Sequence, residues 1–591
     1  MEPTFLKRMF FFVLSDIVLF YVTLSLAYGL RFEFNIDPIY MKTYLHVFVT
    51  LAMVKIFSLF VFNAYSITWR YFSLHDLKRL VYAHILSIGL FYLFFIVFND
   101  FFMPMPRSVI LLDFFLSLVA VGFLRISKRM VMEQGLVLSA RKTIIIGANN
   151  KTRSVIQSAF DEDIDYQPVA IIAIAKEETN FIGSQMHNMK VYAEEDIEKV
   201  VEKENVESAI ITTSMSSERL NKLYERLSRS GVKDVKLAKL LGSQYEKLQS
   251  LSIEDLLARH PKDLDPTLIS KFIKDKKILI TGAGGSIGSE IARQCQDFGA
   301  ASLLLLDHAE YNLYKIKEEL PEAVTRLISV TNRDALRDVF KEFEPDIVIH
   351  AAAYKHVPLC EENIESALKN NIKGTMNVVD LSIENGVQKL VIISTDKAVR
   401  PTNVMGATKR ITELYAQNID SKDTEIVAVR FGNVLGSSGS VIPKFKYQIE
   451  HGGPVTVTHP DMTRFFMLIP EACQLVLQAA SIAKGNELFI LDMGEPVKIV
   501  DLAKKMIQLY GKENEVEIEF TGLRPGEKLY EELMLDESEQ KTKYESIFIT
   551  NPTVYEIGLL KQDINDLLDA TDKISALQKI VPEFKRHEVI G

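Results

Sequence analysis

Residues 277–307 read KILITGAGGSIGSEIARQCQDFGAASLLLLD, and this stretch decides the fold of the longest part of the chain. The apolar residues 278–280 predict a buried strand, residues 289–298 follow a helical pattern that ends before Gly299, and residues 303–306 predict a second strand. Strand, glycine-rich turn, helix and strand in this order form one βαβ unit of a parallel sheet. The stretch therefore predicts an α/β fold of the kind that binds nucleotides.

The turn of this unit carries the residue types that a dinucleotide requires. Gly282, Gly285 and Gly288 have the spacing G-x-x-G-x-x-G, which lets the backbone approach a pyrophosphate at the N-terminus of the helix. Asp307 follows Gly288 by 19 residues, where a carboxylate accepts a hydrogen bond from a ribose 2′-hydroxyl and favours NAD over NADP. A plain structural turn is the alternative, but the complete unit favours a cofactor site. Its predicted cofactor-binding residues are Gly282, Gly285, Ser286, Ile287, Gly288 and Asp307.

The composition limits the class of protein. A chain of 591 residues should hold more than one domain. Its net charge of -9 argues against nucleic acid as a principal partner. The three cysteines, Cys295, Cys360 and Cys473, are far apart and form neither a metal-binding nor a disulfide pattern. We therefore expect no metal site and ordinary reduced thiols.

Four long apolar stretches lie near the N-terminus, at about residues 9–30, 44–64, 81–98 and 109–123. Each is near the roughly 20 residues that a helix needs to cross a bilayer. One such stretch is also compatible with a buried core helix, but four in a row joined by short loops predict a transmembrane region of four helices over residues 1–130. The first stretch is too long for a cleavable signal peptide and lacks a small-residue cleavage site.

Basic residues flank these four spans unequally. Eight lie on the side of the N-terminus and of the segment after the fourth span: Lys7, Arg8, Arg70, Lys78, Arg79, Arg125, Lys128 and Arg129. Three lie on the other side: Arg31, Lys42 and Arg107. The positive-inside rule therefore predicts that both termini face the cytoplasm. Three charged residues lie inside the apolar stretches: Asp16, Lys55 and Asp113. We interpret them as interhelical pairs or snorkelling groups rather than as a functional site.

Residues 141–249 predict a second, smaller α/β domain. Residues 142–147, 169–174 and 208–212 are strand-like, and the polar stretches 194–204 and 217–230 have helical patterns. The first of these strands ends in Gly147, the one glycine that this turn keeps of a phosphate-binding set. A degenerate Rossmann-like domain that packs or regulates is favoured over a second cofactor site.

Residues 253–591 continue the alternation of strands and helices. Residues 346–350, 390–394 and 426–431 predict further buried strands, whose carboxyl ends should meet at one crevice. Ala351 and Ala352 follow the first of them and would let that loop lie close to the cofactor. Thr395, Asp396 and Lys397 directly follow the second. Since Asp-Lys turns are common, both a solvated turn and a catalytic pair fit this pattern.

The C-terminal part resembles the extended short-chain dehydrogenase/reductase superfamily through six motifs: TGAGGSIG, HAAAYKHVP, NNIKGT, ISTDKAV, RFGNVLGSSGSVIP and GLRPGEKLYEEL. More narrowly, it is similar to the membrane-bound nucleotide-sugar 4,6-dehydratases of bacterial polysaccharide and glycoprotein biosynthesis, including the UDP-N-acetylglucosamine C6 dehydratases of bacillosamine and N-linked glycan synthesis. The resemblance covers residues 253–591, and the four spans and the degenerate middle domain fit the long membrane-bound branch. It implies an NAD-dependent dehydratase domain with a small substrate-binding subdomain.

The superfamily's catalytic Tyr-x-x-x-Lys pattern is incomplete in this chain. Lys409 is present, and the resemblance implies that it binds the nicotinamide ribose, but Met405 stands where the tyrosine is expected. A thioether cannot take the substrate hydroxyl proton as the tyrosine does. The departure disfavours a UDP-sugar 4-epimerase, which should keep the tyrosine, and it leaves open a membrane-anchored nucleotide-sensing scaffold without catalysis.

Resemblance to the dehydratases gives the Thr395–Asp396–Lys397 motif roles that oppose loss of catalysis. After oxidation at C4 of the sugar, Lys397 would take the C5 proton and Asp396 would protonate the departing C6 hydroxyl. Lys397 is a base only if its pKa falls well below the reference of about 10.4, while Asp396 as an acid needs the opposite shift. Asp396 is also expected to take the C4 hydroxyl proton, with Thr395 as a relay.

For the rest of the substrate, the resemblance implies two groups of residues. Arg524 belongs to the first, because a guanidinium can grip a diphosphate through two parallel hydrogen bonds. The UDP group comprises Asn433, Lys444, Arg524 and Glu527, and the sugar group comprises Tyr354, Lys355 and His356. An ordinary loop histidine is the alternative for His356. The implied partners are UDP-N-acetylglucosamine, the bacterial inner membrane with the catalytic domain in the cytoplasm, and a second copy of the chain in a homo-oligomer.

Overall fold

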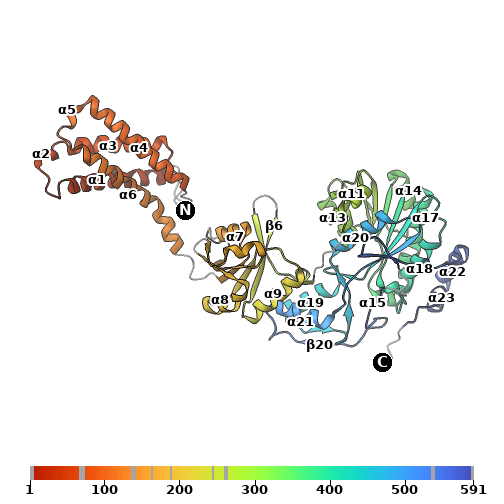
Figure 1. Cartoon of the computed structure of the whole chain (residues 1–591). Coiled ribbons are helices and arrows are strands. Elements are labelled where there is room, and N and C mark those ends of the chain that lie inside the picture. Colours follow the sequence, from red (N-terminus) through yellow and green to blue (C-terminus); the bar gives the residue numbers. More distant parts are fainter. Residues whose placement is uncertain are drawn as a thin grey trace. The chain divides into compact units, whose positions relative to one another are not determined.

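The computed structural model describes residues 5–65, 74–134, 141–160, 164–186, 189–241, 245–257, 264–533 and 540–586. Figure 1 shows N-terminal helices, followed along the chain by two groups of elements that each contain a β-sheet. Two of the expectations concern positions outside the described residues. These are Arg70 in the charge count and residues 587–591 at the end of the expected catalytic domain.

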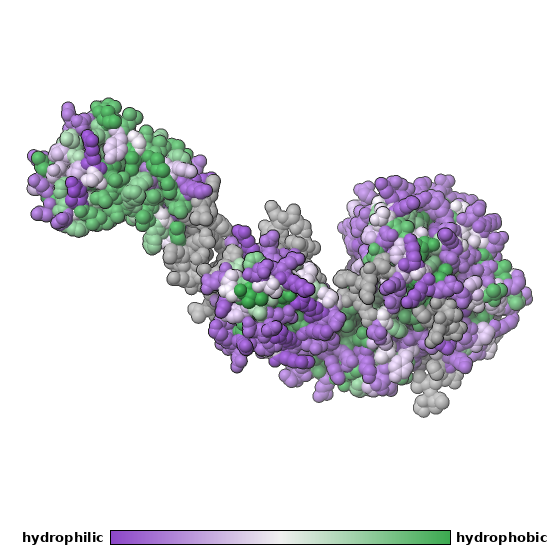
Figure 2. All heavy atoms as spheres, in the orientation of Figure 1, coloured by the Kyte–Doolittle hydropathy of each residue, from purple (hydrophilic) through white to green (hydrophobic). Residues whose placement is uncertain are grey.

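Four N-terminal helices are long and apolar enough to cross a membrane. They coincide with the four expected stretches, although the second helix ends three residues and the third one residue before the expected end, and they are α1 (Phe5–Arg31), α3 (Tyr44–Val61), α4 (Leu74–Val97) and α6 (Arg107–Gln134). Two short helices, α2 (Pro38–Met41) and α5 (Asn99–Phe102), lie between them in the chain. Hydrophobic residues cover much of the visible surface of these helices (Figure 2), as expected for a surface in contact with lipid.

The charges inside these helices form buried ion pairs. Lys55 of α3 pairs with Asp113 of α6, and Arg125 Nη2 of α6 lies 2.7 Å from Asp16 Oδ2 of α1. All four side chains are at most 2% exposed, so the interpretation as interhelical pairs is confirmed. The assignment of Arg125 to the segment after the fourth span is wrong, because Arg125 lies within α6 and Asp16 balances its charge. The imbalance of basic residues persists without it.

The middle of the chain contains a seven-stranded sheet with the order β3-β4-β2-β1-β5-β6-β7. Counted along the chain, its first, second and fifth strands match the expected strands at residues 142–147, 169–174 and 208–212. The strands are β1 (Arg141–Ile146), β2 (Tyr166–Ala173), β3 (Gln185–Met186), β4 (Met189–Ala193), β5 (Ser208–Ile211), β6 (Asp234–Leu241) and β7 (Tyr245–Ser250). The accompanying helices are α7 (Asn150–Phe160), α8 (Ile197–Glu204) and α9 (Ser217–Arg229).

The C-terminal part contains a nine-stranded sheet with the order β10-β9-β8-β11-β12-β13-β18-β22-β21. The strands from β10 to β18 are parallel, and the last two are antiparallel. They are β8 (Lys277–Thr281), β9 (Ser302–Asp307), β10 (Val324–Leu327), β11 (Ile347–His350), β12 (Lys389–Ile393), β13 (Glu425–Arg430), β18 (Glu487–Leu491), β21 (Gln540–Lys541) and β22 (Ile547–Ile549). The order reverses between β8 and β11, which is where such sheets bind ligands.

Both faces of this sheet are covered by helices, which explains why its strands are apolar throughout. Ile278 and Ile280 belong to a core with α11 (Pro266–Ile273), α12 (Ser286–Asp297) and α20 (Ile469–Ile482). Leu279 belongs to a second core with α14 (Arg333–Phe343), α17 (Gly374–Glu384) and α18 (Val404–Asn418). Helix α12 begins at Ser286, three residues earlier than expected, because Gly285 is already its extended N-cap.

A smaller core lies outside this sheet. The helices α19 (Val441–Glu450) and α21 (Ile499–Leu509) pack there with the parallel strands β15 (Val455–Val457) and β20 (Ile518–Phe520). It has the size and composition expected of a small substrate-binding subdomain.

Candidate active site

A cavity of about 870 Å³ opens where β8, β11, β12 and β13 end. Its volume lies in the range of small-molecule sites. Its lining includes most of the residues predicted from the sequence: Gly282, Gly285, Ser286, Ile287, Gly288, Ala351, Tyr354, Lys355, His356, Thr395, Lys397, Met405, Lys409, Asn433, Lys444, Arg524 and Glu527. Three predicted residues are not part of the lining, namely Asp307, Ala352 and Asp396.

The glycine turn after β8 is closely packed. Gly282 has a φ of +67°, and a Cβ there would lie 2.7 Å from the backbone of Ala352. A Cβ on Gly288 would lie 2.2 Å from the carbonyl oxygen of Gly282. Only glycine fits these two positions, and Ala352 acts by packing against the turn rather than by lining the cavity. The turn thereby leaves the N-terminus of α12 exposed to the cavity.

Asp307 is the last residue of β9 and lies beside this turn. Its Oδ2 accepts a hydrogen bond of 2.9 Å from the Gly284 N–H, and its Oδ1 accepts one of 2.9 Å from the Ala309 N–H. These bonds fix the carboxylate, whose remaining lone pairs can accept ribose hydroxyls. The tight glycine turn, the helix N-terminus and the anchored acid together fit a dinucleotide.

Met405 and Lys409 are one turn apart on α18, and both reach the cavity. Met405 is almost fully buried, so a thioether fills the place expected for the tyrosine. Burial lowers the pKa of Lys409 to about 8, against the opposing influence of the Glu413 carboxylate. Glu413 is fully buried and is bonded by the hydroxyl of Ser394 and the guanidinium of Arg430. The Lys409 amine is therefore easier to deprotonate than an ordinary lysine.

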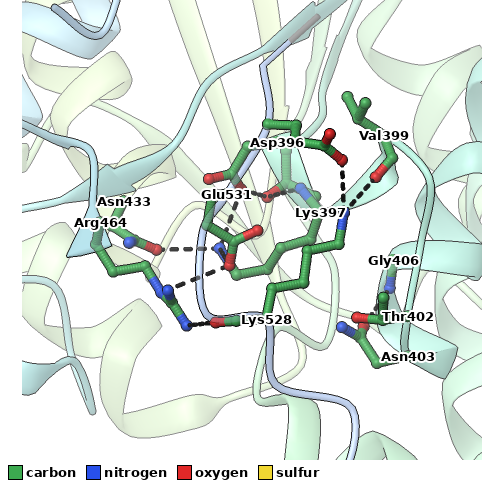
Figure 3. Close-up of polar contacts among 12 residues, drawn as sticks. Asp396, Lys397, Val399, Thr402, Asn403, Gly406, Asn433, Arg464, Lys528 and Glu531 are labelled. Carbon is green, nitrogen blue, oxygen red and sulfur yellow. Dashed lines mark hydrogen bonds and ion pairs between the residues drawn. The ribbon is translucent and has the colours of Figure 1, made fainter. Parts of the chain in front are cut away.

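Asp396 and Lys397 lie in direct contact just after β12, as Figure 3 shows. Asp396 Oδ1 accepts hydrogen bonds from Lys397 Nζ at 3.0 Å and from the Thr395 hydroxyl at 2.8 Å. Lys397 Nζ also donates to Asn433 Oδ1 at 3.1 Å. Asp396 is fully buried, and its Oδ2 has no hydrogen-bond partner within the described residues. A buried carboxylate oxygen without a hydrogen-bond partner has a lone pair that can accept a proton.

The electrostatics of Lys397 differ from the expectation. Burial acts to lower its pKa, but the carboxylates of Asp396 and Glu531 outweigh burial and the nearby Arg464, so that the pKa is raised. The lowering that a base would require is therefore not found, because the sequence does not reveal how many carboxylates surround this amine. Lys397 is an ammonium group in this state.

Two charged residues of the site were not predicted. The side chain of Glu531 is 2% exposed, and its Oε1 lies 3.6 Å from Lys397 Nζ and 3.5 Å from Arg464 Nε. Arg464 Nη1 and Nη2 donate to the backbone carbonyls of Thr463, Lys528 and Leu529. Glu531 falls within the motif GLRPGEKLYEEL, which was the one available signal, and Arg464 had none.

Lys444 and Arg524 supply positive charge elsewhere in the cavity. Burial and the charge of Arg524 lower the pKa of Lys444, although Glu527 opposes them. Lys444 Nζ donates to Thr456 Oγ1 at 2.6 Å, and Glu527 Oε2 accepts from the Arg524 N–H at 3.2 Å. Two cations that repel each other in one cavity are stabilised by an anion such as a diphosphate.

Comparison with known proteins places the chain in a family. The sequence profile described as "Polysaccharide biosynthesis protein" matches residues 278–552. The chain is 42% identical over 531 residues to "Capsular polysaccharide biosynthesis protein CapD" of Staphylococcus aureus, covering 85% of this chain and 88% of the relative. It is 43% identical over 495 residues to "Probable polysaccharide biosynthesis protein EpsC" of Bacillus subtilis, covering 80% and 82%.

A third relative matches about half of the chain. It is "UDP-N-acetylglucosamine 4,6-dehydratase (inverting)" of Campylobacter jejuni, 34% identical over 292 residues, which cover 47% of this chain and 84% of the relative. The two longer matches extend beyond the nucleotide-binding sheet into the N-terminal half of the chain. The chain therefore belongs to the polysaccharide biosynthesis protein family of nucleotide-sugar enzymes, within the extended short-chain dehydrogenase/reductase superfamily.

Proposed function

We propose that this protein is an NAD-dependent 4,6-dehydratase that converts UDP-N-acetylglucosamine to a UDP-2-acetamido-2,6-dideoxy-4-keto-hexose. The observation that carries the proposal is the contact between the buried Asp396 and Lys397, which lines the cavity together with Met405 in place of a phenol. An acid and an amine in contact are suited to an elimination, whereas a 4-epimerase needs the tyrosine. The named activity of the Campylobacter jejuni relative supports the choice of UDP-N-acetylglucosamine.

The residues around the glycine turn hold the cofactor. A bound NAD would supply the hydride acceptor for C4 of the sugar and, once reduced, the hydride donor for C6. The N-terminus of α12 binds the pyrophosphate, and Asp307 accepts from the ribose hydroxyls. Lys409 donates to the nicotinamide ribose. The thioether of Met405 excludes water without contributing a proton.

Asp396 and Lys397 move the protons of the reaction. Asp396 takes the C4 hydroxyl proton, with the Thr395 hydroxyl as relay, since Thr395 Oγ1 lies 2.8 Å from Asp396 Oδ1. The C4 ketone makes the C5 hydrogen acidic, and the Lys397 amine removes it. Asp396 then gives its proton to the C6 hydroxyl, which leaves as water, and Lys397 returns its proton to C5. Both residues end in the protonation state in which they began.

The remaining residues bind UDP and orient the sugar. Lys444 and Arg524 neutralise the diphosphate, and Asn433 and Glu527 complete the UDP site. Tyr354, Lys355 and His356 line the sugar pocket. The catalytic domain, residues 253–591, lies in the cytoplasm, residues 1–130 form a four-span anchor in the bacterial inner membrane, and residues 141–249 form a degenerate Rossmann-like domain. We further propose that the chain forms a homo-oligomer.

The test is mass spectrometry of UDP-N-acetylglucosamine incubated with the purified full chain in detergent, without added reductant. The proposal requires a product lighter by one water. A product of unchanged mass and inverted C4 would indicate an epimerase, and unaltered substrate would indicate a scaffold. The matched control is Asp396→Asn, which should form no product.

A further inference from the structure

The proton on Lys397 poses a problem for the proposed reaction. The amine can remove the C5 proton only when it is neutral, yet its surroundings raise its pKa and hold it as an ammonium group. A side chain in contact with Lys397 must therefore take this proton before C5 is attacked. Three side chains lie close enough to Lys397 Nζ: Asp396 Oδ1 at 3.0 Å, Asn433 Oδ1 at 3.1 Å and Glu531 Oε1 at 3.6 Å.

Two of these three side chains are unsuited to the task. Asn433 presents an amide oxygen, which is too weak a base to hold the proton. Asp396 must begin as a carboxylate, because it takes the C4 hydroxyl proton and passes it to the C6 hydroxyl. Glu531 is the remaining group, and its role rests on the proposed function.

We propose that Glu531 acts through Lys397 as a positioning residue that takes the ammonium proton when substrate fills the cavity. One N–H bond of Lys397 breaks and one O–H bond of Glu531 forms, so an ammonium–carboxylate pair becomes an amine–carboxylic acid pair. The step needs no other reactant. Since Lys397 later returns the C5 proton to C5, Glu531 keeps its proton until product leaves.

The surroundings of Glu531 suit this exchange. Its side chain is 2% exposed, and its Oε2 is buried without a hydrogen-bond partner among the described residues, which leaves a site for the proton. Burial disfavours charged forms, and a substrate that displaces water strengthens that effect. The Arg464 guanidinium, whose Nε lies 3.5 Å from Glu531 Oε1, is a second cation beside this carboxylate.

Glu531 is also held in place by its own segment. The Gly526 carbonyl accepts hydrogen bonds from Thr402 Oγ1 and Asn403 Nδ2, both at 3.0 Å. The neighbouring charges point elsewhere, because Lys528 Nζ donates to the Val399 carbonyl and Glu532 pairs with Arg400 and Lys528. Lys397 and Arg464 are therefore the charged groups that face Glu531, with Asp396 on the other side of Lys397.

The experiment measures deuterium uptake at C5 of UDP-N-acetylglucosamine in single turnovers of the NAD-loaded full chain, at several pH values between about 6 and 9. The wild-type rate should be nearly independent of pH, because the proton moves within the pair. Glu531→Gln should be slower by ~10²-fold at neutral pH, and its rate should rise about tenfold per pH unit, because the ammonium must then release its proton to solvent. Glu531→Asp should restore the flat profile, and the matched control Glu532→Gln should keep it.

Two results would overturn the inference alone: a flat profile in Glu531→Gln, or a loss of rate that is equal at every pH. No C5 exchange in the wild type would overturn the proposed function and the inference with it. If Glu531→Gln does not hold NAD, the protonation of Glu531 is tested in the wild type, by infrared difference spectra recorded with and without substrate on protein that contains ¹³C-labelled glutamate. Substrate should then produce a carboxylic acid band that shifts with the label, and an unshifted or missing band would overturn the proposal.

Discussion

The middle and C-terminal sheets begin alike and differ where their ligands would lie. β1 and β8 each end before a glycine with positive φ, +121° at Gly147 and +67° at Gly282, and a helix follows each turn. In the C-terminal sheet the crevice is open and Asp307 stands beside it. In the middle sheet a carboxylate of the chain itself, from Glu178, occupies the corresponding ends of the strands.

Glu178 comes from a short 3₁₀ helix, Lys176–Phe181, that follows β2. Its carboxylate accepts hydrogen bonds from the backbone N–H groups of Ile174 and Ala175, from Thr213 Oγ1 at 2.7 Å and from Asn149 Nδ2 at 3.2 Å. Burial acts to raise its pKa, but these hydrogen bonds outweigh burial and lower it. The difference teaches that a nucleotide-binding fold can keep its turn and still satisfy the donors internally.

The largest effect is expected from Lys397→Ala, which tests whether the chemistry belongs to the C-terminal crevice. Exchange of the C5 hydrogen with solvent deuterium should fall by about 10²–10⁴-fold, because the Lys397 amine is the proposed base for this proton. Lys222→Ala, on α9 beside the middle sheet, is the control and should exchange normally. Normal exchange in the Lys397 variant would assign the base elsewhere.

Asp396→Asn should slow both the oxidation at C4 and the elimination, by a factor similar to that expected for Lys397→Ala. An amide accepts no proton from the C4 hydroxyl, so oxidation as well as elimination should slow by ~10²–10⁴-fold, while Thr395→Val should cause a partial loss. The measurement is the near-ultraviolet absorbance of reduced nicotinamide in a single turnover. If the Asn variant accumulates this absorbance at the normal rate and stalls only afterwards, the dual role of Asp396 is wrong.

Asp307→Ala should weaken NAD binding by about 1.5–3 kcal/mol, or roughly 10- to 150-fold, through loss of a charge-assisted hydrogen bond. A binding titration of the purified chain measures this change. Asp165→Ala, just before β2 of the middle sheet, serves as a control. Unchanged affinity in the Asp307 variant would show that the acid holds its turn without contacting the ribose.

The pKa of Lys409 predicts that the affinity for NAD, measured in the same titration, changes a few-fold with pH. Its pKa of about 8 means that the amine is cationic below that pH and neutral above it. Affinity for NAD should therefore decline as the pH rises through about 8, because a neutral amine bonds the ribose less strongly. Lys409→Arg stays cationic, so the decline should vanish in that variant. A decline of equal size in both would assign it to another group.

Glu178→Gln should have the smallest effect on function. The NAD stoichiometry and turnover should be unchanged, because the middle crevice takes no part in the reaction. The free energy of unfolding should fall by about 1–3 kcal/mol, since a carboxylate that accepts from four donors is replaced by an amide that cannot accept from all of them. Denaturant titration measures the loss. A second bound NAD in this variant would show that the middle crevice also binds the cofactor once the Glu178 carboxylate is removed.

The sequence predicted what depends on local pattern and missed what depends on distant contacts. The βαβ unit, the four spans and the strand ends at Ala351 and Thr395 follow from short-range periodicity, and the structure contains them. The surroundings of Lys397 include Arg464 and Glu531, 67 and 134 residues further along the chain. No local pattern reports such a neighbour, and so the sequence could not give the direction of the Lys397 pKa. For the same reason it could not reveal Glu178 in the middle crevice.

The two buried ion pairs of the N-terminal helices have a consequence for biogenesis. Helix α6 carries one member of each pair, Asp113 and Arg125, whose partners Lys55 and Asp16 belong to helices made earlier. Each of these charges alone in lipid costs about 2.5–3.5 kcal/mol on an insertion scale. Since α6 is translated last of the four, both partners are already available when it leaves the ribosome. Helix α6, the most charged of the four, is thus inserted when the residues that pair with its charges have already been synthesised.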